Sequence, residues 1–236
     1  MRAFYYEFGS CILLYPYLAI WLLEVSKIVE NTVSLQGTDI EARLFPPQPP
    51  SNISLSVGSV LDMPSAWTNT FDLVHQRLLI AALRRSEWPI ALSQIFRILK
   101  PGGWVQLAEV GKMHLQGPKT LQHESLLSKL FAHRDMLRDC ASHLPVMLIE
   151  AGFSDVRVET RLILLGKRGG RDGEDARDNF MGVYRGMKTP ILKAGGLGFF
   201  GSEVEFDNFM DEMEDEWDEG APVREFTVFL ARKPYV

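Results

Sequence analysis

The fold of this chain is decided by residues 71–110, FDLVHQRLLIAALRRSEWPIALSQIFRILKPGGWVQLAEV. Within this stretch, the apolar residues 71–74 predict a short buried strand, and residues 104–110 predict a second one. Between them, an apolar stripe at helical spacing predicts a helix over residues 86–99, with Ser86 as its N-cap. The stripe consists of Trp88, Leu92, Ile95, Phe96 and Leu99. This strand–helix–strand unit predicts an α/β fold with a mostly parallel sheet.

The same alternation extends toward the N-terminus. Residues 20–28 mix apolar and charged side chains in a way that suits a helix. Residues 33–39 suit a short strand that ends at Asp39, and residues 53–60 suit another strand after the proline-rich loop at 46–50. We therefore expect strands and helices to alternate through the first half of the chain.

The second half of the chain reads differently. Residues 112–148 are mainly helical in pattern, residues 156–165 and 225–231 suit strands, and residues 166–178 read as a polar, glycine-rich surface loop. Residues 203–219 hold ten carboxylates and no basic residue. Their apolar members recur at helical spacing, namely Phe206, Phe209, Met210, Met213 and Trp217. A cation site is the sharper interpretation of the acidic run, but the spacing favours the solvated face of an amphipathic helix.

Composition places the chain among globular proteins. It has 236 residues, of which 46% are hydrophobic and 23% charged, and this length suits a single α/β domain with appended elements. The net charge of −5 argues against nucleic-acid binding driven by bulk charge. Cys11 and Cys140 are too few for a secreted disulfide framework, so we expect free thiols in a reducing compartment. We expect a cytoplasmic location, with the nucleus as the alternative.

An uncharged segment near the N-terminus raises the question of a membrane anchor. Residues 8–23 carry no charge, but this run is shorter than the roughly 20 residues that a span needs, and Pro16 interrupts it. The residues that follow it do not form a signal-peptide cleavage site. We therefore expect a buried segment and no membrane span.

Two kinds of side chain could carry chemistry. An acid at the end of the second strand of a nucleotide-binding sheet, here Asp39, can accept hydrogen bonds from both hydroxyls of an adenosine ribose. The alternative for Asp39 is an ordinary turn or cap residue. The five histidines, at 75, 114, 123, 133 and 143, include no pair at metal-binding helical spacing, so we expect no metal site. One of them could serve as a general base.

Several runs occur in an order and spacing that resemble a known family. They are GTDIEARLFPPQPPSNI at 37–53, FDLVHQRLL at 71–79 and LKPGGWVQLAEV at 99–110. This part of the chain resembles the class I S-adenosylmethionine-dependent methyltransferases and, more narrowly, their fungal LaeA-like group. The resemblance fades after residue 110 and returns at Ala151-Gly152-Phe153 and in the closing FLARKP.

The resemblance implies a Rossmann-like sheet with helices on both faces, a reversed C-terminal hairpin strand, and S-adenosyl-L-methionine as cofactor. It implies that Asp39 holds the cofactor ribose and that Ser59 and Val60 lie beside the adenine. His75 and Gln76 would line the methionine end of the cofactor, and His75 is the candidate catalytic residue. Many relatives have an acid in place of Ser59, which accepts from the adenine amino group more strongly than a hydroxyl does.

The N-terminus departs from the family pattern. Relatives carry a glycine-rich loop before the first helix, because glycine lets the backbone approach the cofactor closely. Here Tyr15, Tyr17 and Ala19 align with the glycines, and Leu13 aligns with the acid of the family motif. Two interpretations stay open: the start of the coding sequence is misassigned or lost, or the protein has shed its main cofactor loop.

The sequence thus predicts one methyltransferase domain over residues 1–236, with an atypical segment at 1–19 and a helical substrate-cap insertion at 112–148. The first functional hypothesis is methyl transfer to an oxygen of a small aromatic or polyketide-like secondary metabolite, with a nitrogen or carbon acceptor as the less favoured alternative. The second is a catalytically impaired, methyltransferase-like protein that binds a protein partner and regulates secondary metabolism. A nicotinamide dehydrogenase is disfavoured, because the chain has no dinucleotide-binding fingerprint.

Overall fold

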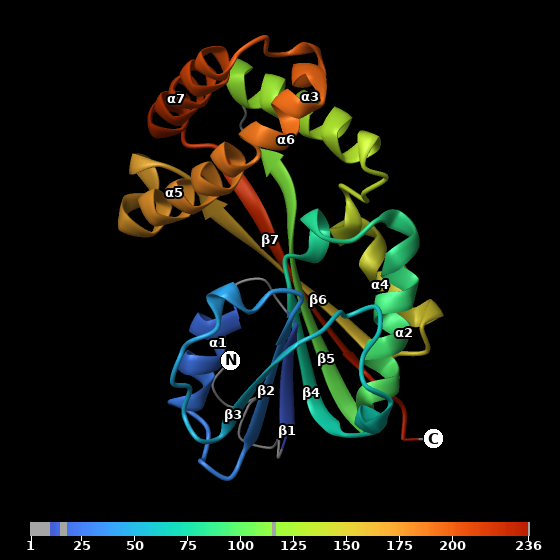
Figure 1. Cartoon of the computed structure of the whole chain (residues 1–236). Helices are drawn as coiled ribbons and strands as arrows, with labels where there is room; N and C mark the ends of the chain where they lie inside the picture. The colour runs from blue at the N-terminus through green and yellow to red at the C-terminus, as the bar shows by residue number, and fades with distance from the viewer. Residues whose placement is uncertain (1–9, 15–17, 115–116, 236) are drawn as a thin grey trace. The chain divides into compact units, whose positions relative to one another are not determined.

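The computed structural model describes residues 10–14, 18–114 and 117–235, and its largest feature is a seven-stranded sheet in the order β3-β2-β1-β4-β5-β7-β6 (Figure 1). The strands are β1 Ser10–Leu14, β2 Ser34–Asp39, β3 Ile53–Val57, β4 Phe71–Arg77, β5 Leu99–His114, β6 Ser154–Leu164 and β7 Val223–Arg232. The helices are α1 Leu18–Ser26, α2 Trp88–Ile98, α3 Pro118–His133, α4 Cys140–Glu150, α5 Gly170–Gly186, α6 Lys188–Lys193 and α7 Glu203–Gly220. No helix in these ranges is long and apolar enough to cross a membrane.

The chain divides into two compact units. The first comprises Met1–Glu109, Cys140–Glu159 and Val228–Val236, and the second comprises Val110–Asp139 and Thr160–Thr227. Residues 112–148 are largely helical, as the sequence predicts, but α3 belongs to the second unit and α4 to the first.

The first unit contains the parallel part of the sheet. Strand β1 pairs in parallel with β2 on one side and with β4 on the other, while β3 and β5 extend the sheet outward in parallel. The last strand runs the other way: the amide of Gly102 donates to the Lys233 carbonyl, and the Lys233 amide donates to Gly103, each at 2.9 Å. The start of β5 therefore lies beside the end of β7, which confirms the predicted reversed strand.

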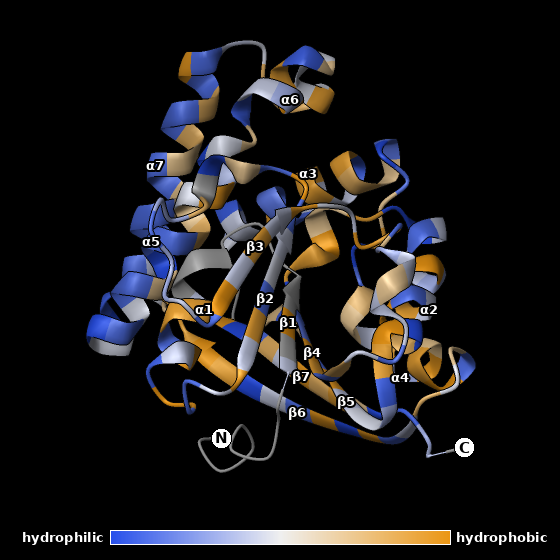
Figure 2. Cartoon of the chain, turned by 60° about the horizontal axis from the view of Figure 1, so that its bottom comes forward, coloured by the Kyte–Doolittle hydropathy of each residue, from blue (hydrophilic) through white to orange (hydrophobic). Residues whose placement is uncertain are grey.

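Helix α1 covers one face of this sheet, and α2 and α4 cover the other (Figure 1). The interface under α1 is apolar on both sides, and hydrophobic stretches appear on α1 and along the strands (Figure 2). Its buried members are Leu22, Val25, Val29, Val33, Leu35, Ile53 and Leu73. On the opposite side, α2 buries Trp88, Ala91, Leu92, Ile95 and Ile98. The α/β fold predicted from the sequence is thus confirmed.

The prediction that Ser86 caps α2 is wrong. Ser86 lies inside a short 3₁₀ turn, Arg85–Glu87, that precedes the helix. The Glu87 carboxylate accepts a hydrogen bond from the main-chain amide of Arg84 at 2.7 Å and so closes this turn. Pro89 in the first turn of α2 has no N–H group that would need an acceptor there, and the helix begins without a side-chain cap.

Strand β1 is fastened beside β4 at the amino end of the sheet. The Ser10 amide and hydroxyl donate to Asp72 Oδ2 at 2.9 and 2.8 Å, and Lys100 Nζ lies 2.9 Å from both carboxylate oxygens of Asp72. Burial alone would raise the pKa of Asp72, but its hydrogen bonds with Lys100 and Ser10 and the Lys100 charge lower that pKa below the ordinary 3.8. The ionised carboxylate is therefore the form that stabilises the fold.

Asp72→Asn is expected to lower the free energy of unfolding by about 1 kcal/mol at pH 7, because hydrogen bonds to a charged group are lost at a partly exposed site. Since the folded-state pKa is depressed, the contribution is present above about pH 4 and is lost as the pH falls through the folded pKa. Urea unfolding at pH 7 and pH 3.5 measures both effects. Glu24→Gln, at an exposed carboxylate on α1, serves as the control; an equal loss in both variants would contradict the assignment.

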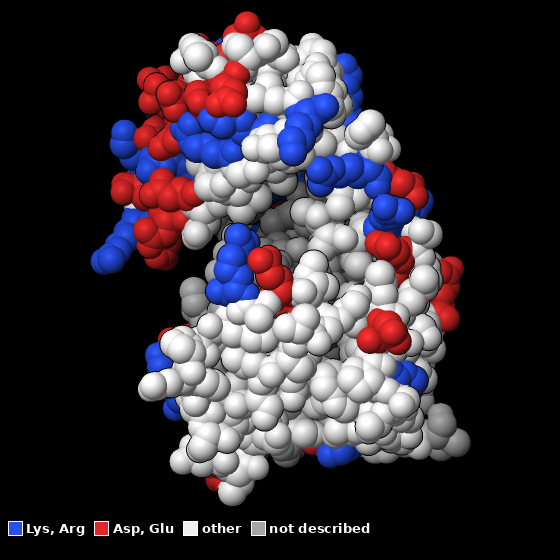
Figure 3. Space-filling view, in the orientation of Figure 1, with Lys and Arg blue, Asp and Glu red and all other residues white. Residues whose placement is uncertain are grey.

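In the second unit, α7 packs its apolar stripe inward as predicted. Phe206, Phe209, Met210, Met213 and Trp217 are all buried. The acidic side chains of α7 are not all solvated, however, because one of them binds another helix. Glu216 accepts hydrogen bonds from the main-chain amides of Lys119 and Thr120 at 2.8 Å each, and so caps the N-terminus of α3. Charges of both signs interleave over α5 and α7 on the face that Figure 3 shows.

The prediction of a polar loop over residues 166–178 is wrong, because most of this segment belongs to α5. Its glycines mark close packing instead of a flexible loop. A Cβ atom at Gly173 would lie 2.6 Å from the Gly166 carbonyl oxygen and 2.7 Å from that of Leu164, so only glycine fits. The Gly166 amide donates to the Gly173 carbonyl at 2.9 Å and joins the start of the helix to the preceding turn.

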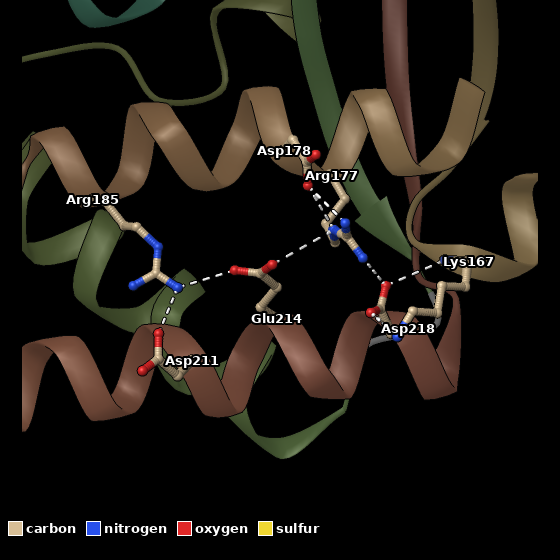
Figure 4. A network of polar contacts seen from close by, with 7 residues as sticks. All are labelled: Lys167, Arg177, Asp178, Arg185, Asp211, Glu214 and Asp218. Atoms are coloured by element: carbon tan, nitrogen blue, oxygen red, sulfur yellow. Dashed lines mark hydrogen bonds and ion pairs between the residues drawn. The ribbon is translucent and has the colours of Figure 1, made fainter. Parts of the chain in front are cut away.

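Ion pairs between α5 and α7 stabilise α5, the helix that the polar, glycine-rich composition did not predict (Figure 4). Arg177 contacts Asp218 and lies 3.9 Å from Glu214, and Arg185 lies 2.7 Å from Asp211 and 3.0 Å from Glu214. The carboxylates predicted to be solvated are thus partly paired with basic side chains of the neighbouring helix.

Candidate functional site

The candidate site lies in the first unit, at the carboxyl ends of the parallel strands. Strands β2 and β3 lie on one side of β1, and β4 and β5 lie on the other, so the strand order reverses at β1. Ligands of open α/β sheets bind at such a switch point, outside the carboxyl ends of the strands. Strand β1 ends at Leu14 and α1 begins at Leu18, so the connection at this point spans only three residues. Tyr15 and Tyr17 belong to that connection and lie outside the described residues, as does Pro16.

Asp39 is the last residue of β2 and is half-buried. Its Oδ1 accepts a hydrogen bond from the Glu41 amide at 2.9 Å. Burial raises the pKa of Asp39 above 3.8, and the neighbouring Glu41 charge adds to this effect. The Asp39 carbonyl accepts from the Gly58 amide at 2.8 Å, which joins the end of β2 to the end of β3. Asp39 therefore presents a carboxylate that the backbone holds in place at the end of β2.

Ser59 and Val60 follow β3 and are half-buried in a tight turn. The Ser59 hydroxyl oxygen accepts from the Leu61 amide at 3.1 Å, and the Ser59 carbonyl accepts from the Asp62 amide at 3.1 Å. The hydroxyl is thus engaged as an acceptor within its own turn, although its proton stays available for donation.

His75 and Gln76 are neighbours near the end of β4, but successive residues of a strand point to opposite faces. His75 is 4% exposed and stacks on Trp21 of α1, with ring centroids 4.2 Å apart. Neither ring nitrogen makes a well-oriented hydrogen bond to a described residue. Burial lowers the pKa of His75 to about 3, the Gln106 side chain opposes this shift, and the Arg77 charge adds to it. His75 is therefore a neutral, weakly basic ring at physiological pH.

Gln76 belongs to a buried polar cluster that the sequence analysis missed. Glu109, near the middle of β5, is fully buried and accepts from Gln76 Nε2 and from the Leu79 amide at 2.7 Å each. Its second oxygen accepts from the Ile80 amide at 3.3 Å. Burial raises the pKa of Glu109 to about 7, although these hydrogen bonds and the Arg77 charge oppose the shift. The sequence signal that could have identified Glu109 is that it is the single acid in the apolar run WVQLAEV.

The turn after β4 has an unusual backbone. Leu78 has φ 56° and ψ 41°, a left-handed conformation that costs a non-glycine residue about 1–2 kcal/mol. Its amide donates to the Ala108 carbonyl at 2.9 Å, and the two amides that follow it are those that bind Glu109. The surrounding hydrogen bonds thus hold a strained turn beside the switch point.

Of the remaining histidines, His114, His123 and His133 belong to the second unit and His143 to the first. His123 is buried, with its ring centroid 4.2 Å from that of Tyr184. Burial lowers the pKa of His123 to about 3, and Arg224 and Arg138 add to this effect. His114 Nε2 lies 2.8 Å from Glu225, while His133 and His143 are exposed. The described residues contain no cluster of His, Cys, Asp or Glu that could hold a metal ion.

Comparison with known proteins agrees with this fold. A family model described as a methyltransferase domain matches residues 18–107. The N-methyltransferase gliN of Aspergillus fumigatus is 29% identical over 91% of this chain and 79% of its own length. The N-methyltransferase sirN of Leptosphaeria maculans is 44% identical, but over only 42% of this chain and 35% of its own length.

Solved structures show the same architecture. A phosphoethanolamine N-methyltransferase 2 of Haemonchus contortus, solved with S-adenosyl-L-methionine, aligns with a TM-score of 0.58 and 15% identity. The alignment covers 96% of this chain, which spans about half of that structure, 49% of its length.

A sheet in this strand order, with a reversed final strand and a ligand edge at its switch point, defines the class I methyltransferase fold. The chain has this fold, and the domain match and the curated relatives support an S-adenosyl-L-methionine-dependent methyltransferase. The narrower resemblance to the LaeA-like group stays a prediction.

Proposed function

We propose that this chain transfers a methyl group from S-adenosyl-L-methionine to a nitrogen atom of a small fungal secondary metabolite. The observation that carries the proposal is the naming of four fungal relatives, gliN, sirN, tcpN and verN, as N-methyltransferases. The sequence analysis favoured an oxygen acceptor, and these relatives move the proposal to nitrogen. A cytoplasmic or nuclear location and a small-molecule acceptor fit the same proposal.

The residues at the carboxyl edge fit the cofactor. Asp39 presents a half-buried carboxylate at the carboxyl end of β2, which suits the ribose hydroxyls. Ser59 and Val60 follow the next strand and would lie beside the adenine. Gln76 Oε1 is a buried acceptor without a hydrogen bond to a described residue, which suits an N–H donor at the methionine end of the cofactor.

Positioning explains most of the catalysis on this proposal. The bound cofactor supplies a methyl group that is already activated on a sulfonium, so the protein has to align the acceptor and exclude water. A neutral amine attacks with its own lone pair and needs no strong base beforehand. The low pKa of His75, about 3, agrees with a role in shaping the site, since such an imidazole takes up a proton poorly at pH 7.

A methyltransferase-like binding protein with impaired catalysis is the second candidate. It is favoured by Tyr15 and Tyr17, which occupy the place in the chain, between β1 and α1, where relatives have glycines. A tyrosine side chain there would occupy space that the cofactor needs.

Two measurements separate these functions. Calorimetric titration with S-adenosyl-L-methionine tests cofactor binding. Incubation with the radiolabelled methyl donor then tests a panel of small amines, amides and phenols. Labelled amines or amides support the proposal, and labelled phenols alone would return the acceptor to oxygen. Cofactor binding without transfer to any panel member would favour the binding protein.

Asp39→Ala is expected to weaken cofactor binding by about 1.5–3 kcal/mol, the range for hydrogen bonds to a charged group. Stability should change little, because this half-buried acid lies at the end of a strand. The measurement is calorimetric titration of both proteins. Glu41→Gln, at the exposed neighbouring acid, is the matched control and should bind as the parent does. Equal affinities of Asp39→Ala and the parent, with cooperative unfolding in both, would remove Asp39 from the site.

A further inference from the structure

Glu109 has no role in the cofactor contacts described above, yet it organises the backbone next to them. Its carboxylate is fully buried in β5, and its hydrogen bonds with described residues come from the end of β4 and the turn that follows. Leaving a carboxylate in such a place is costly unless its hydrogen bonds are satisfied. Three donors from one short segment, Gln76 to Ile80, satisfy it here.

The three hydrogen bonds to Glu109 hold a strained segment of the backbone in place. Leu78 holds a left-handed backbone, and the amides of the next two residues both point to Glu109. Strained non-glycine conformations persist only where the surroundings hold them in place. The same carboxylate orients the side-chain amide of Gln76, because Gln76 Nε2 donates to Glu109 Oε1 at 2.7 Å. This fixes the opposite atom, Gln76 Oε1, which has no described partner.

We propose that Glu109 is a positioning residue for the cofactor site: its carboxylate fixes the Gln76 amide and the Leu78–Ile80 turn at the switch point of the sheet. This inference rests on the proposed function, because it assumes that the cofactor binds at that edge. It assigns Glu109 no contact with the reacting atoms.

The charge on the carboxylate matters for this role. An ionised carboxylate accepts hydrogen bonds about twice as strongly as a neutral group. Burial raises the pKa of Glu109 to about 7, so more of the carboxyl group is ionised at pH 8 than at pH 6. The charged group that acts on it is Arg77, and His75, the neighbour of Gln76 in the chain, stays neutral over this range because burial lowers its pKa to about 3. We therefore expect the turn to be held more firmly at pH 8.

The first test is amide hydrogen exchange of residues 77–83 in the intact chain, corrected for the intrinsic effect of pH. Protection of the Leu79 and Ile80 amides should be about fivefold higher at pH 8 than at pH 6 in the parent protein, because bonds to a charged acceptor are stronger. In Glu109→Gln the side-chain amide would face the Ile80 amide donor, so protection should fall and its pH dependence should vanish. Glu24→Gln, at an exposed acid, should behave as the parent.

The second test is calorimetric titration of the same three proteins with S-adenosylhomocysteine at both pH values. The parent should bind about fivefold more tightly at pH 8, and Glu109→Gln should bind weakly and equally at both. Equal protection of the turn in the parent and in a cooperatively folded Glu109→Gln would overturn the proposal. If Glu109→Gln does not fold, a pH-independent parent in both tests would overturn it.

The two tests also separate this inference from the proposed function. A parent protein that fails to bind S-adenosylhomocysteine at either pH contradicts cofactor binding at this edge. The exchange data still decide whether Glu109 holds the turn.

Discussion

Replacing Tyr15 and Tyr17 by glycine is expected to tighten S-adenosyl-L-methionine binding by about 3 kcal/mol, a factor of ~150, if the backbone recovers one or two hydrogen bonds to the charged cofactor. The reason is the position of these residues in the chain. Strand β1 ends at Leu14 and α1 begins at Leu18, so the two tyrosines fall where relatives place glycines that let the backbone approach the cofactor.

The measurement is calorimetric titration of the double glycine variant against the parent in one buffer. Tyr15→Phe with Tyr17→Phe is the matched control, because it keeps both rings and should leave the affinity unchanged. The point variants leave β1 intact, whereas exchanging the whole N-terminal segment would remove the Ser10 contacts with Asp72. A parent that already binds tightly and a glycine variant that gains nothing would show that the alignment of this segment is wrong.

Trp217→Ala is expected to lower the free energy of unfolding of the second unit by about 3–5 kcal/mol, the range for removing a buried aromatic side chain. Trp217 is 0% exposed. Its ring contacts those of Phe180 and Tyr184, with centroids 6.5 and 6.2 Å away. Its Nε1 donates to the Thr120 hydroxyl at 2.8 Å, so the variant also leaves a buried hydroxyl with one partner fewer.

Trp217→Phe separates the two contributions. It keeps an aromatic ring in the core and removes the hydrogen bond, so a smaller loss, about 1–2 kcal/mol, is expected. Chemical denaturation followed by far-ultraviolet circular dichroism measures both variants. A loss below about 1 kcal/mol for Trp217→Ala would contradict the central packing role of this ring.

The fold of the first unit could be predicted from the sequence because its signals are local. The apolar strand at β4, the stripe of α2 and the end of β2 at Asp39 all rest on periodicity over a few residues. Helix α5 could not be predicted in this way. Its glycines serve close contacts with the carbonyls of Leu164 and Gly166, and Arg177 finds its partner Asp218 on α7. Such tertiary contacts override the turn-forming composition.

The residues of the candidate site also divide into those that local sequence signals predict and those that tertiary contacts define. Asp39 could be nominated because a strand end and an acid coincide in the sequence. Glu109 could not, because its partners Leu79 and Ile80 come from another strand's turn and bind through main-chain amides, which no side-chain pattern records. The resemblance to methyltransferases named Gln76 but gave no hint that a buried carboxylate orients it.

The path of the chain through the two units has a consequence for how the protein is made. The first unit is assembled from three separated stretches, and β7, which lies between β5 and β6, follows all the other strands of the sheet in the chain. Strand β6 therefore has no neighbour on its inner side until β7 has been synthesised. Completion of the sheet thus depends on a late, long-range pairing that is intrinsically slow and leaves an open edge beforehand.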